Sequence, residues 1–312
     1  MNHKNQGKQL ADSRNQFGIT QAKLAQVVGI SRKHLSEIEN GKVQLKRKQW
    51  KNLKETLARF DPDLPLEIIF DYLRIRFPTT DIQHVMENIL RIKLLHVGYE
   101  DRGFYGYDGR YYIGDVEVMV SSQEELGILL ELKGRGCRQF EIYLNGQRRS
   151  WYEFLSACIV EQGVFKRLDL AINDRTGILN IPHLAEKCIK GECISIFRKF
   201  TEYRSGELIR ERYKDTVGMG HTLYIGSEKS EIYFCLYEKD YEQYVKYNIP
   251  IEDAKTKNRL EIRLKGKRAE EAVYDLVGYE EPQLTAFGII NHYLRFVDKK
   301  RCRRTDWPVS PE

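Results

Sequence analysis

The chain has 312 residues, of which 41% are hydrophobic and 31% are charged, and its 51 Lys and Arg against 45 Asp and Glu give a formal net charge of +6. These proportions exclude a disordered chain, no apolar run approaches the roughly 18 residues of a membrane-crossing helix, and the polar start lacks the apolar segment of a secretory signal. We therefore expect a folded, cytoplasmic protein of two or three domains without membrane insertion.

The basic excess is confined to the first fifth of the chain. Residues 1–60 hold 13 basic and 4 acidic side chains, a local charge of +9, whereas residues 61–312 hold 38 basic and 41 acidic ones, a local charge of −3. Neutralising DNA phosphates needs such an excess and packing does not, so the distribution favours a DNA-binding domain over residues 1–60.

Two short helices joined by a tight turn are predicted within this domain. Thr20 is placed to cap a helix over 21–28 that ends at Gly29, and Ser31 to cap a helix over 32–40 that ends at Gly41. This arrangement is a helix-turn-helix signature.

Residues 18–25, 29–31 and 38–41 together resemble the lambda-repressor-like (Xre-type) helix-turn-helix family. In that family the second helix enters the major groove with its first residues against base edges. The resemblance implies that the DNA contacts come from Gln21 at the backbone and from Ser31, Arg32, Lys33 and Ser36. A helical bundle that binds another protein is the alternative.

Residues 61–66 contain two prolines and are expected to be a linker into a domain over 67–312. Strands are predicted at 67–77, 111–120, 127–133, 138–144, 165–173, 195–203, 222–225, 231–238 and 258–265, and helices at 80–94, 151–162, 181–190, 268–276 and 284–297. Several connections are too short for a helical crossover, so the sheet should be mainly antiparallel. The expected fold class is α+β, with a small all-α domain followed by an antiparallel-sheet domain.

Four of these strands, 138–144, 165–173, 231–238 and 258–265, alternate apolar and polar residues. If they share a sheet, their polar residues lie together on one face. That face would present Glu141, Asp169, Glu261 and Tyr237 among Arg167, Lys239, Arg259 and Arg263.

This set of side chains is suited to phosphodiester chemistry. Three carboxylates can hold a divalent cation such as Mg²⁺ or Mn²⁺, the arginines and the lysine can hold DNA phosphates, and a tyrosine hydroxyl can act as a nucleophile. Periodicity alone leaves open a second interpretation, an exposed sheet face with ordinary cross-strand ion pairs.

Segments 137–141, 167–174, 224–227, 233–243 and 259–265 resemble the Rep_trans (MOB-T) family of rolling-circle plasmid initiators and conjugative-transposon relaxases. The likeness extends from about residue 66 to the end and is strongest to the relaxases. It implies that Tyr237 attacks the nicked DNA strand, with Tyr233, Tyr241 and Tyr244 as competing candidates.

The resemblance also implies a metal held by Glu141, Asp169 and Glu261, with Asp174 and Asp71 as further candidates. Many relaxases bind their metal through a His-hydrophobe-His pair, but none of the seven histidines here has that spacing. Any Mg²⁺ or Mn²⁺ must therefore be held mainly by carboxylates.

The function implied is that of a site- and strand-specific DNA relaxase acting at the origin of transfer of a conjugative element. It would form a 5′-phosphotyrosine and a free 3′-hydroxyl, and could rejoin the strand. Expected partners are double- and single-stranded DNA at that origin, with a helicase, accessory DNA-processing proteins or a coupling protein as further candidates. A rolling-circle plasmid initiator and a non-catalytic Xre-type repressor are the alternatives.

Overall fold

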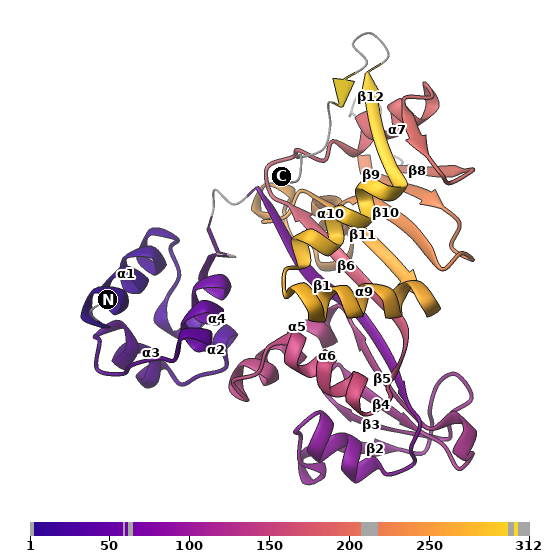
Figure 1. Ribbon diagram of the computed structural model, residues 1–312. Helices are drawn as coiled ribbons and strands as arrows, with labels where there is room; N and C mark the ends of the chain where they lie inside the picture. The colour runs from indigo at the N-terminus through magenta and orange to yellow at the C-terminus, as the bar shows by residue number, and fades with distance from the viewer. Residues whose placement is uncertain (1–2, 59, 62–64, 207–217, 299–302, 305–312) are drawn as a thin grey trace. The chain divides into compact units, whose positions relative to one another are not determined.

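The computed structural model describes residues 3–58, 60–61, 65–206, 218–298 and 303–304 of the chain (Figure 1). Two compact units are formed, one by Met1–Leu64 with Arg74–Val164 and the other by Pro65–Leu73 with Phe165–Glu312. Within the described ranges, every helix is too short or too polar to cross a membrane. Part of the predicted linker, residues 62–64, lies outside them.

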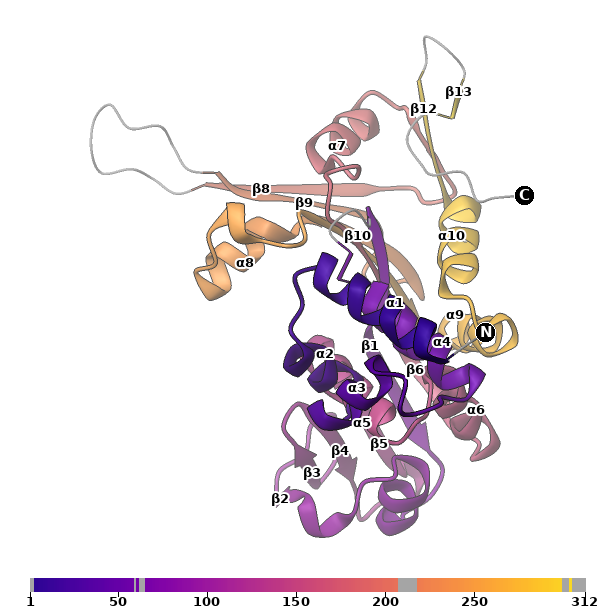
Figure 2. The same cartoon turned by 90° about the vertical axis from the view of Figure 1, so that its left-hand side faces the viewer.

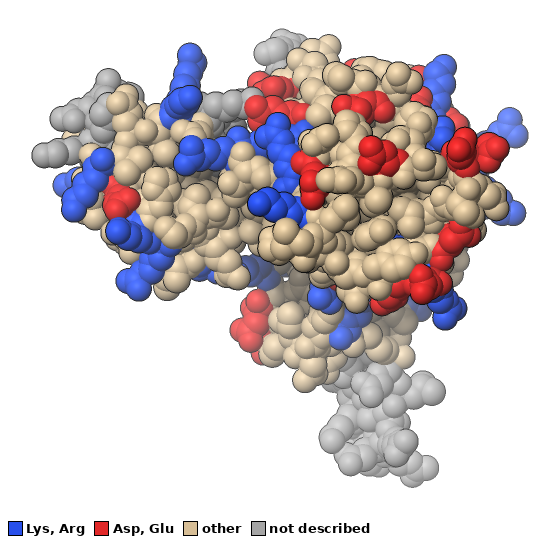
Figure 3. Space-filling model, turned by 90° about the horizontal axis from the view of Figure 1, so that it is seen from below, with Lys and Arg blue, Asp and Glu red and all other residues tan. Residues whose placement is uncertain are grey.

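The first unit begins with four helices, α1 (His3–Gln16), α2 (Gln21–Val28), α3 (Arg32–Glu39) and α4 (Arg47–Ala58). The predicted caps are confirmed, because the Thr20 hydroxyl accepts from the Lys23 amide and the Ser31 hydroxyl from the His34 amide, each at 3.1 Å. The helices enclose a small core of their own: Leu10, Leu24, Ala25, Val28, Leu35, Ile38, Leu53 and Leu57. On the face of these helices that Figure 3 shows, basic side chains outnumber acidic ones.

The rest of the first unit is a small antiparallel sheet with helices on one face. Its strands β2 (Gly98–Glu100), β3 (Gly109–Ile113), β4 (Val116–Val120) and β5 (Ile128–Lys133) pair in chain order. Its helices are α5 (Gly134–Gly146), α6 (Trp151–Val160), a π-helix over His84–Ile89, and 3₁₀ turns at Leu94–His96 and Glu124–Leu126. Helix α5 packs on β4 and β5.

The prediction of a strand at 138–144 is wrong, because these residues belong to α5. Cys137, Phe140 and Leu144 are almost completely buried, and their spacing of three and four residues is that of a helix face. Phe140 and Leu144 fit a two-residue period as well as a helical one, which made the alternation misleading.

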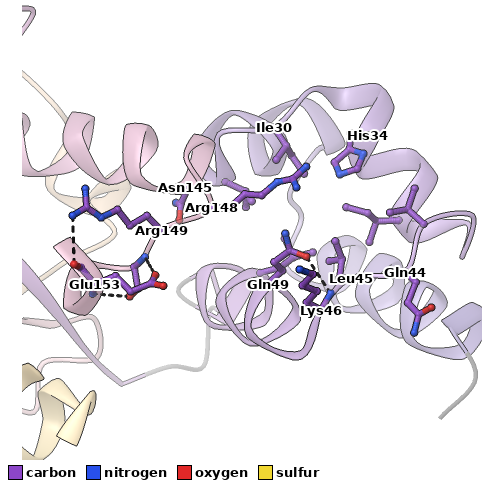
Figure 4. A pocket seen from close by; sticks show the side chains of 15 residues that line it. Ile30, His34, Gln44, Leu45, Lys46, Gln49, Asn145, Arg148, Arg149 and Glu153 are labelled. Carbon is purple, nitrogen blue, oxygen red and sulfur yellow. Dashed lines mark hydrogen bonds between the residues drawn. The ribbon is translucent and has the colours of Figure 1, made fainter. Parts of the chain in front are cut away.

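The end of α5 lies against helix α2 of the same unit. The Asn145 side-chain amide donates to the Val27 carbonyl at 3.1 Å. Gly29 at the end of α2 has φ +72°, and a Cβ there would lie 2.6 Å from the Gly146 nitrogen, so the close approach requires glycine. A cavity of about 530 Å³ remains between them, with Ile30, His34 and Leu45 on one wall and Asn145 and Arg148 on the other (Figure 4).

The second unit contains the larger sheet. Its strands, in the order β1-β6-β11-β10-β9-β8, are β1 (Leu66–Phe77), β6 (Val164–Asp174), β11 (Asn258–Lys265), β10 (Ile232–Glu238), β9 (Gly218–Gly226) and β8 (Phe200–Gly206). The last residues of β1, from Arg74 onward, belong to the first unit. Its helices are α7 (Ile181–Ile189), α8 (Lys239–Tyr247), α9 (Gly266–Tyr279), α10 (Pro282–Tyr293) and a 3₁₀ turn at Ile251–Asp253. A smaller sheet pairs β7 (Cys193–Ser195), β12 (Leu294–Asp298) and β13 (Arg303–Arg304).

Two predicted elements of this unit are divided in the structure. The predicted strand 195–203 is interrupted, because β7 ends at Ser195 and β8 begins at Phe200. The predicted helix 284–297 ends at Tyr293 and continues as β12. The antiparallel pairing of β6, β11, β10, β9 and β8 and the α+β class are confirmed.

The large sheet has one apolar and one polar face. Its apolar side chains, including Phe234, Leu236, Leu260, Ile262 and Leu170, are fully buried. Helices α9 and α10 lie along this face in Figure 1, with α9 packed against β11. The opposite face carries the polar residues that the alternation predicts.

Candidate active site

The register of three central strands brings the predicted polar residues together. Opposite residues in antiparallel strands share a face. One row joins Tyr237 of β10, Arg259 of β11 and Asn173 of β6. A second joins Tyr233, Arg263 and Asp169, and Glu261 lies between the two rows, opposite Cys235.

The Tyr237 hydroxyl contacts a glutamate and a lysine. Its hydroxyl donates to Glu261 Oε1 at 2.8 Å, and Lys239 Nζ donates to the Tyr237 oxygen at 3.4 Å. Burial and the Glu261 charge raise the pKa of Tyr237 above its usual value. Burial and the neighbouring Arg259 lower the pKa of Lys239, which also pairs with Glu242 of α8.

Two arginines flank this tyrosine. Arg259 donates from Nε to Asn173 at 2.8 Å and from Nη1 to Asp71 at 3.0 Å. Arg263 pairs with Glu261 at 2.7 Å and donates to the Tyr233 hydroxyl at 3.1 Å. A guanidinium has five N–H donors, so these contacts leave donors for a phosphate.

Asp169 is the most deeply buried acid on this face, at 2% exposed. Burial raises its carboxyl pKa to about 6, although Arg167 pairs with it at 2.6 Å and opposes the shift. The Arg167 guanidinium in turn lies over the Tyr72 ring, 4.0 Å from its centre.

Glu141 is the predicted site residue that does not lie on this sheet. It belongs to α5 of the first unit and pairs with Arg138 at 2.8 Å, one helical turn away. The other predicted residues, Asp169, Glu261, Tyr237, Arg167, Lys239, Arg259 and Arg263, all come from β6, β10, β11 or the first residue of α8.

The predicted three-carboxylate metal site is not formed by the described side chains. No three of the His, Cys, Asp and Glu residues in that part of the chain are arranged to hold an ion. Asp169 and Glu261 share a face, but each carboxylate is engaged by an arginine. Binding a cation here would require them to exchange those arginines for the ion.

The further metal candidates and competing tyrosines have other surroundings. Asp174 accepts from the amides of Gly177 at 2.8 Å and Leu179 at 2.7 Å, so it fixes the turn after β6. Tyr241 and Tyr244 lie on α8, beyond the end of the strand.

The sequence patterns did not indicate Glu242, Asn173 and Tyr72, which position the charged residues. Helix α8 packs beside β9 (Figure 2), where Gly220 has φ +92° and a Cβ would lie 2.8 Å from Tyr241 Cβ. Gly220 is therefore the residue in the sequence that could have indicated that another segment packs closely against this strand.

Comparison with known proteins places this arrangement in a family. "Putative DNA relaxase NicK" of Bacillus subtilis (strain 168) is 42% identical over 248 residues, which cover 79% of this chain and 69% of that protein. The family model for "Replication initiation factor" matches residues 163–312, and that for "Rolling Circle replication initiation protein N-terminal domain" matches residues 67–157. The chain belongs to the replication initiation factor family. The predicted resemblance is therefore confirmed.

A solved structure shares the fold of this replication initiation factor. It is the rolling circle replication initiator protein from Geobacillus stearothermophilus, 26% identical, with a TM-score of 0.63 over 79% of this chain and 93% of that one. All of the Tyr237 surroundings on β6, β10 and β11 fall within the region that matches the replication initiation factor model.

The chain also carries a helix-turn-helix domain, because residues 10–57 match a helix-turn-helix model. Arg32 and Lys33 are exposed at the start of α3, and Ser36 is half-buried one turn later. Ser31 caps α3, as its hydroxyl accepts from His34.

Gln21 has a partner within the helix-turn-helix domain itself. Its side-chain amide donates to Glu39 at 2.7 Å, and Glu39 also forms a buried pair with Arg14 at 2.6 Å. One amide hydrogen of Gln21 is thereby used, and the second is left for a DNA phosphate.

Proposed function

We propose that this protein is a site- and strand-specific DNA relaxase that nicks one strand at the origin of transfer of a conjugative element. The observation that carries the proposal is the contact of Tyr237 with Glu261 and Lys239. The relatives of this chain include a protein named as a putative DNA relaxase. A hydroxyl between a carboxylate and an ammonium is suited to become a nucleophile.

The proposed reaction is a transesterification. Glu261 takes the Tyr237 proton while the phenolate oxygen attacks the phosphorus atom and forms a new O–P bond. The bond from phosphorus to the 3′-oxygen breaks, which leaves a 5′-phosphotyrosine and, after the 3′-oxygen takes a proton, a free 3′-hydroxyl. Attack by that hydroxyl on the phosphotyrosine reverses each step and rejoins the strand.

The charged neighbours would hold the phosphate. Lys239 and Arg259 lie nearest to Tyr237, and Arg263 and Arg167 lie along the same face. Their donors would bind the non-bridging oxygens, where negative charge accumulates in the transition state.

A requirement for Mg²⁺ or Mn²⁺ is also part of the proposal. Asp169 and Glu261 are the carboxylates on this face that would hold the ion, once it replaces their arginines. A divalent cation would polarise the scissile phosphate.

The helix-turn-helix domain would bind duplex DNA next to the nicked site. Tethering raises the effective concentration of the catalytic domain at that site without any new contact there. Once the strand is nicked, a helicase, accessory DNA-processing proteins or a coupling protein would act on the complex.

The experiment is a covalent-adduct assay with the full chain. A supercoiled plasmid carrying the DNA that flanks the gene is incubated with Mn²⁺ and the protein, and the products are separated under denaturing conditions. The wild type should give nicked plasmid with protein attached to the 5′ end. Tyr237→Phe should give none.

Tyr233→Phe is the matched control. Tyr233 lies on the same strand and face but is buried and bound to Arg263, so its loss should leave the adduct. An adduct that persists in Tyr237→Phe and disappears in Tyr233→Phe would reassign the nucleophile. A non-catalytic repressor would give no adduct with any of these proteins.

A rolling-circle plasmid initiator is the second candidate function. It is favoured by the fold shared with the Geobacillus stearothermophilus initiator. The nicking chemistry would be the same, so the two functions differ in the DNA that is cut. Nicking of a plasmid replication origin, but not of the flanking transfer region, would select the initiator.

A further inference from the structure

The polar face of the large sheet continues past Tyr237 to its edge. Thr222 of β9 is opposite Tyr237 of β10, and Tyr203 of β8 is opposite Thr222. Residues opposite one another in antiparallel strands project to the same face, so Tyr203 shares the face of Tyr237. Two strand spacings separate them, which is about 10 Å.

Tyr203 presents an aromatic ring to solvent at this place. Its side chain is 61% exposed, whereas on the central strand β10 Tyr233 is buried and Tyr237 is half-buried. The ring meets Tyr224 of β9 edge to face, with centres 5.9 Å apart and planes at 87°. Tyr224 is half-buried, so it supports one side of the Tyr203 ring while the rest stays accessible.

An exposed ring at this distance from a nucleophile has a specific use in binding DNA. Unpaired bases stack on aromatic side chains, whereas paired bases in a duplex offer no free face. At the duplex rise of about 3.4 Å per nucleotide, 10 Å corresponds to about three nucleotides, and an extended single strand covers that distance in fewer. A strand whose phosphate is at Tyr237 can therefore place a nearby base over Tyr203.

We propose that Tyr203, supported by Tyr224, is a base-stacking subsite for single-stranded DNA, within about three nucleotides of the phosphate at Tyr237. The proposal deepens the proposed relaxase function and rests on it for the position of the phosphate. The subsite selects for unpaired DNA and is tolerant of base identity, because every base has a face that can stack.

The test measures binding of two fluorescein-labelled 12-mers, oligo-dT and an abasic chain of the same length, by fluorescence anisotropy with the full-length protein at one salt concentration. Tyr203→Ala should weaken oligo-dT binding by about tenfold and leave binding of the abasic chain unchanged. Tyr203→Trp should bind oligo-dT as the wild type does, because it keeps an aromatic ring.

Tyr274→Ala is the control. Tyr274 is 60% exposed on α9, which packs on the opposite face of the sheet, so its loss should change neither affinity. An unchanged affinity of Tyr203→Ala for oligo-dT would overturn the proposal, as would an equal loss for both chains, which would indicate damaged folding or lost phosphate contacts.

Failure of the subsite and failure of the relaxase function give different results. If the wild type forms the Tyr237 adduct and Tyr203→Ala binds oligo-dT normally, the subsite is overturned and nicking stands. If Tyr203→Ala loses only oligo-dT binding and no adduct forms, the base contact is supported and nicking fails.

Discussion

The Tyr237 hydroxyl donates to Glu261 Oε1 at 2.8 Å, although the residue directly opposite Glu261 on β10 is Cys235. The contact is therefore diagonal, between residues on neighbouring rows of the sheet. A carboxylate that is offset in this way reaches the phenol oxygen from the neighbouring strand.

Glu261→Gln should reduce nicking by about 10²–10⁴-fold, because an amide cannot accept the tyrosine proton. The rate of the variant should rise with pH as hydroxide takes over this role. Initial rates of plasmid nicking across a pH series measure both effects. Glu252→Gln, at an exposed carboxylate in the 3₁₀ turn after α8, is the control and should nick normally. Full activity of Glu261→Gln would show that another group takes the proton.

Lys239→Met should lower the nicking rate by about a hundredfold, because an ammonium that stabilises the phenolate and the phosphate is lost. Lys239→Arg should retain part of the rate. The pKa of Lys239 is lowered, so it loses its charge at a lower pH than an ordinary lysine does. A decline in nicking at alkaline pH should therefore occur in the wild type and be absent from Lys239→Arg, whose guanidinium stays charged. Identical alkaline profiles would contradict this role.

Asp169→Asn should change how stability depends on pH. The carboxyl pKa is about 6 when folded and lies near 3.8 when unfolded, so the unfolded chain binds fewer protons between these values and the stability of the wild type falls as pH rises. The variant lacks this dependence. The difference in unfolding free energy, variant minus wild type, should therefore increase by up to about 3 kcal/mol from pH 4 to pH 7. Urea unfolding at both pH values measures the difference, and a constant difference would contradict it.

Arg32→Ala and Lys33→Ala should weaken binding to duplex DNA. Each lost base-edge contact should cost about 1–3 kcal/mol of affinity for the specific site and relax the sequence preference there. Cleavage of a short single-stranded site should stay unchanged, because neither residue lies on the sheet face that carries Tyr237. Lys54→Ala, which removes the same charge from the exposed side of α4, is the control. Equal losses in duplex binding and single-strand cleavage would mean that the helices are needed for catalysis itself.

Removal of divalent cations with EDTA should abolish nicking while single-stranded DNA binding persists, and Mn²⁺ or Mg²⁺ should restore it. Asp169→Asn should need a higher Mn²⁺ concentration than the wild type if that carboxylate holds the ion. Undiminished nicking in EDTA would contradict the metal requirement. The arginines and Lys239 would then be the groups that stabilise the negative charge of the transition state.

The face of the central strands could be predicted from the sequence because its signal is local. In β10 and β11 every second residue is apolar and fully buried, so the alternation placed Tyr237, Arg259, Glu261 and Arg263 correctly on one side. The sequence predicted a mainly antiparallel sheet, but it predicted neither the pairing of β10 with β11 nor the diagonal contact of Tyr237 with Glu261. Which side chain contacts which across two paired strands depends on their register and on side-chain conformation, and neither can be read from one strand's sequence.

Glu141 shows where the same reasoning failed. A short apolar pattern that fits two periods is decided by what packs against it, and here β4 and β5 cover one side of a helix. Tyr203 was missed for a related reason, because the break between β7 and β8 shifts the start of that strand and only the register shows which face the ring occupies.

Strand β10 is hydrogen-bonded on both sides, to β9 and to β11, along the whole segment that ends at Tyr237. A DNA strand linked to this tyrosine would be anchored to an inner strand of the sheet. Tension on the DNA during unwinding would then be distributed over two ladders of backbone hydrogen bonds, and the fold would serve as a mechanical anchor as well as a catalyst.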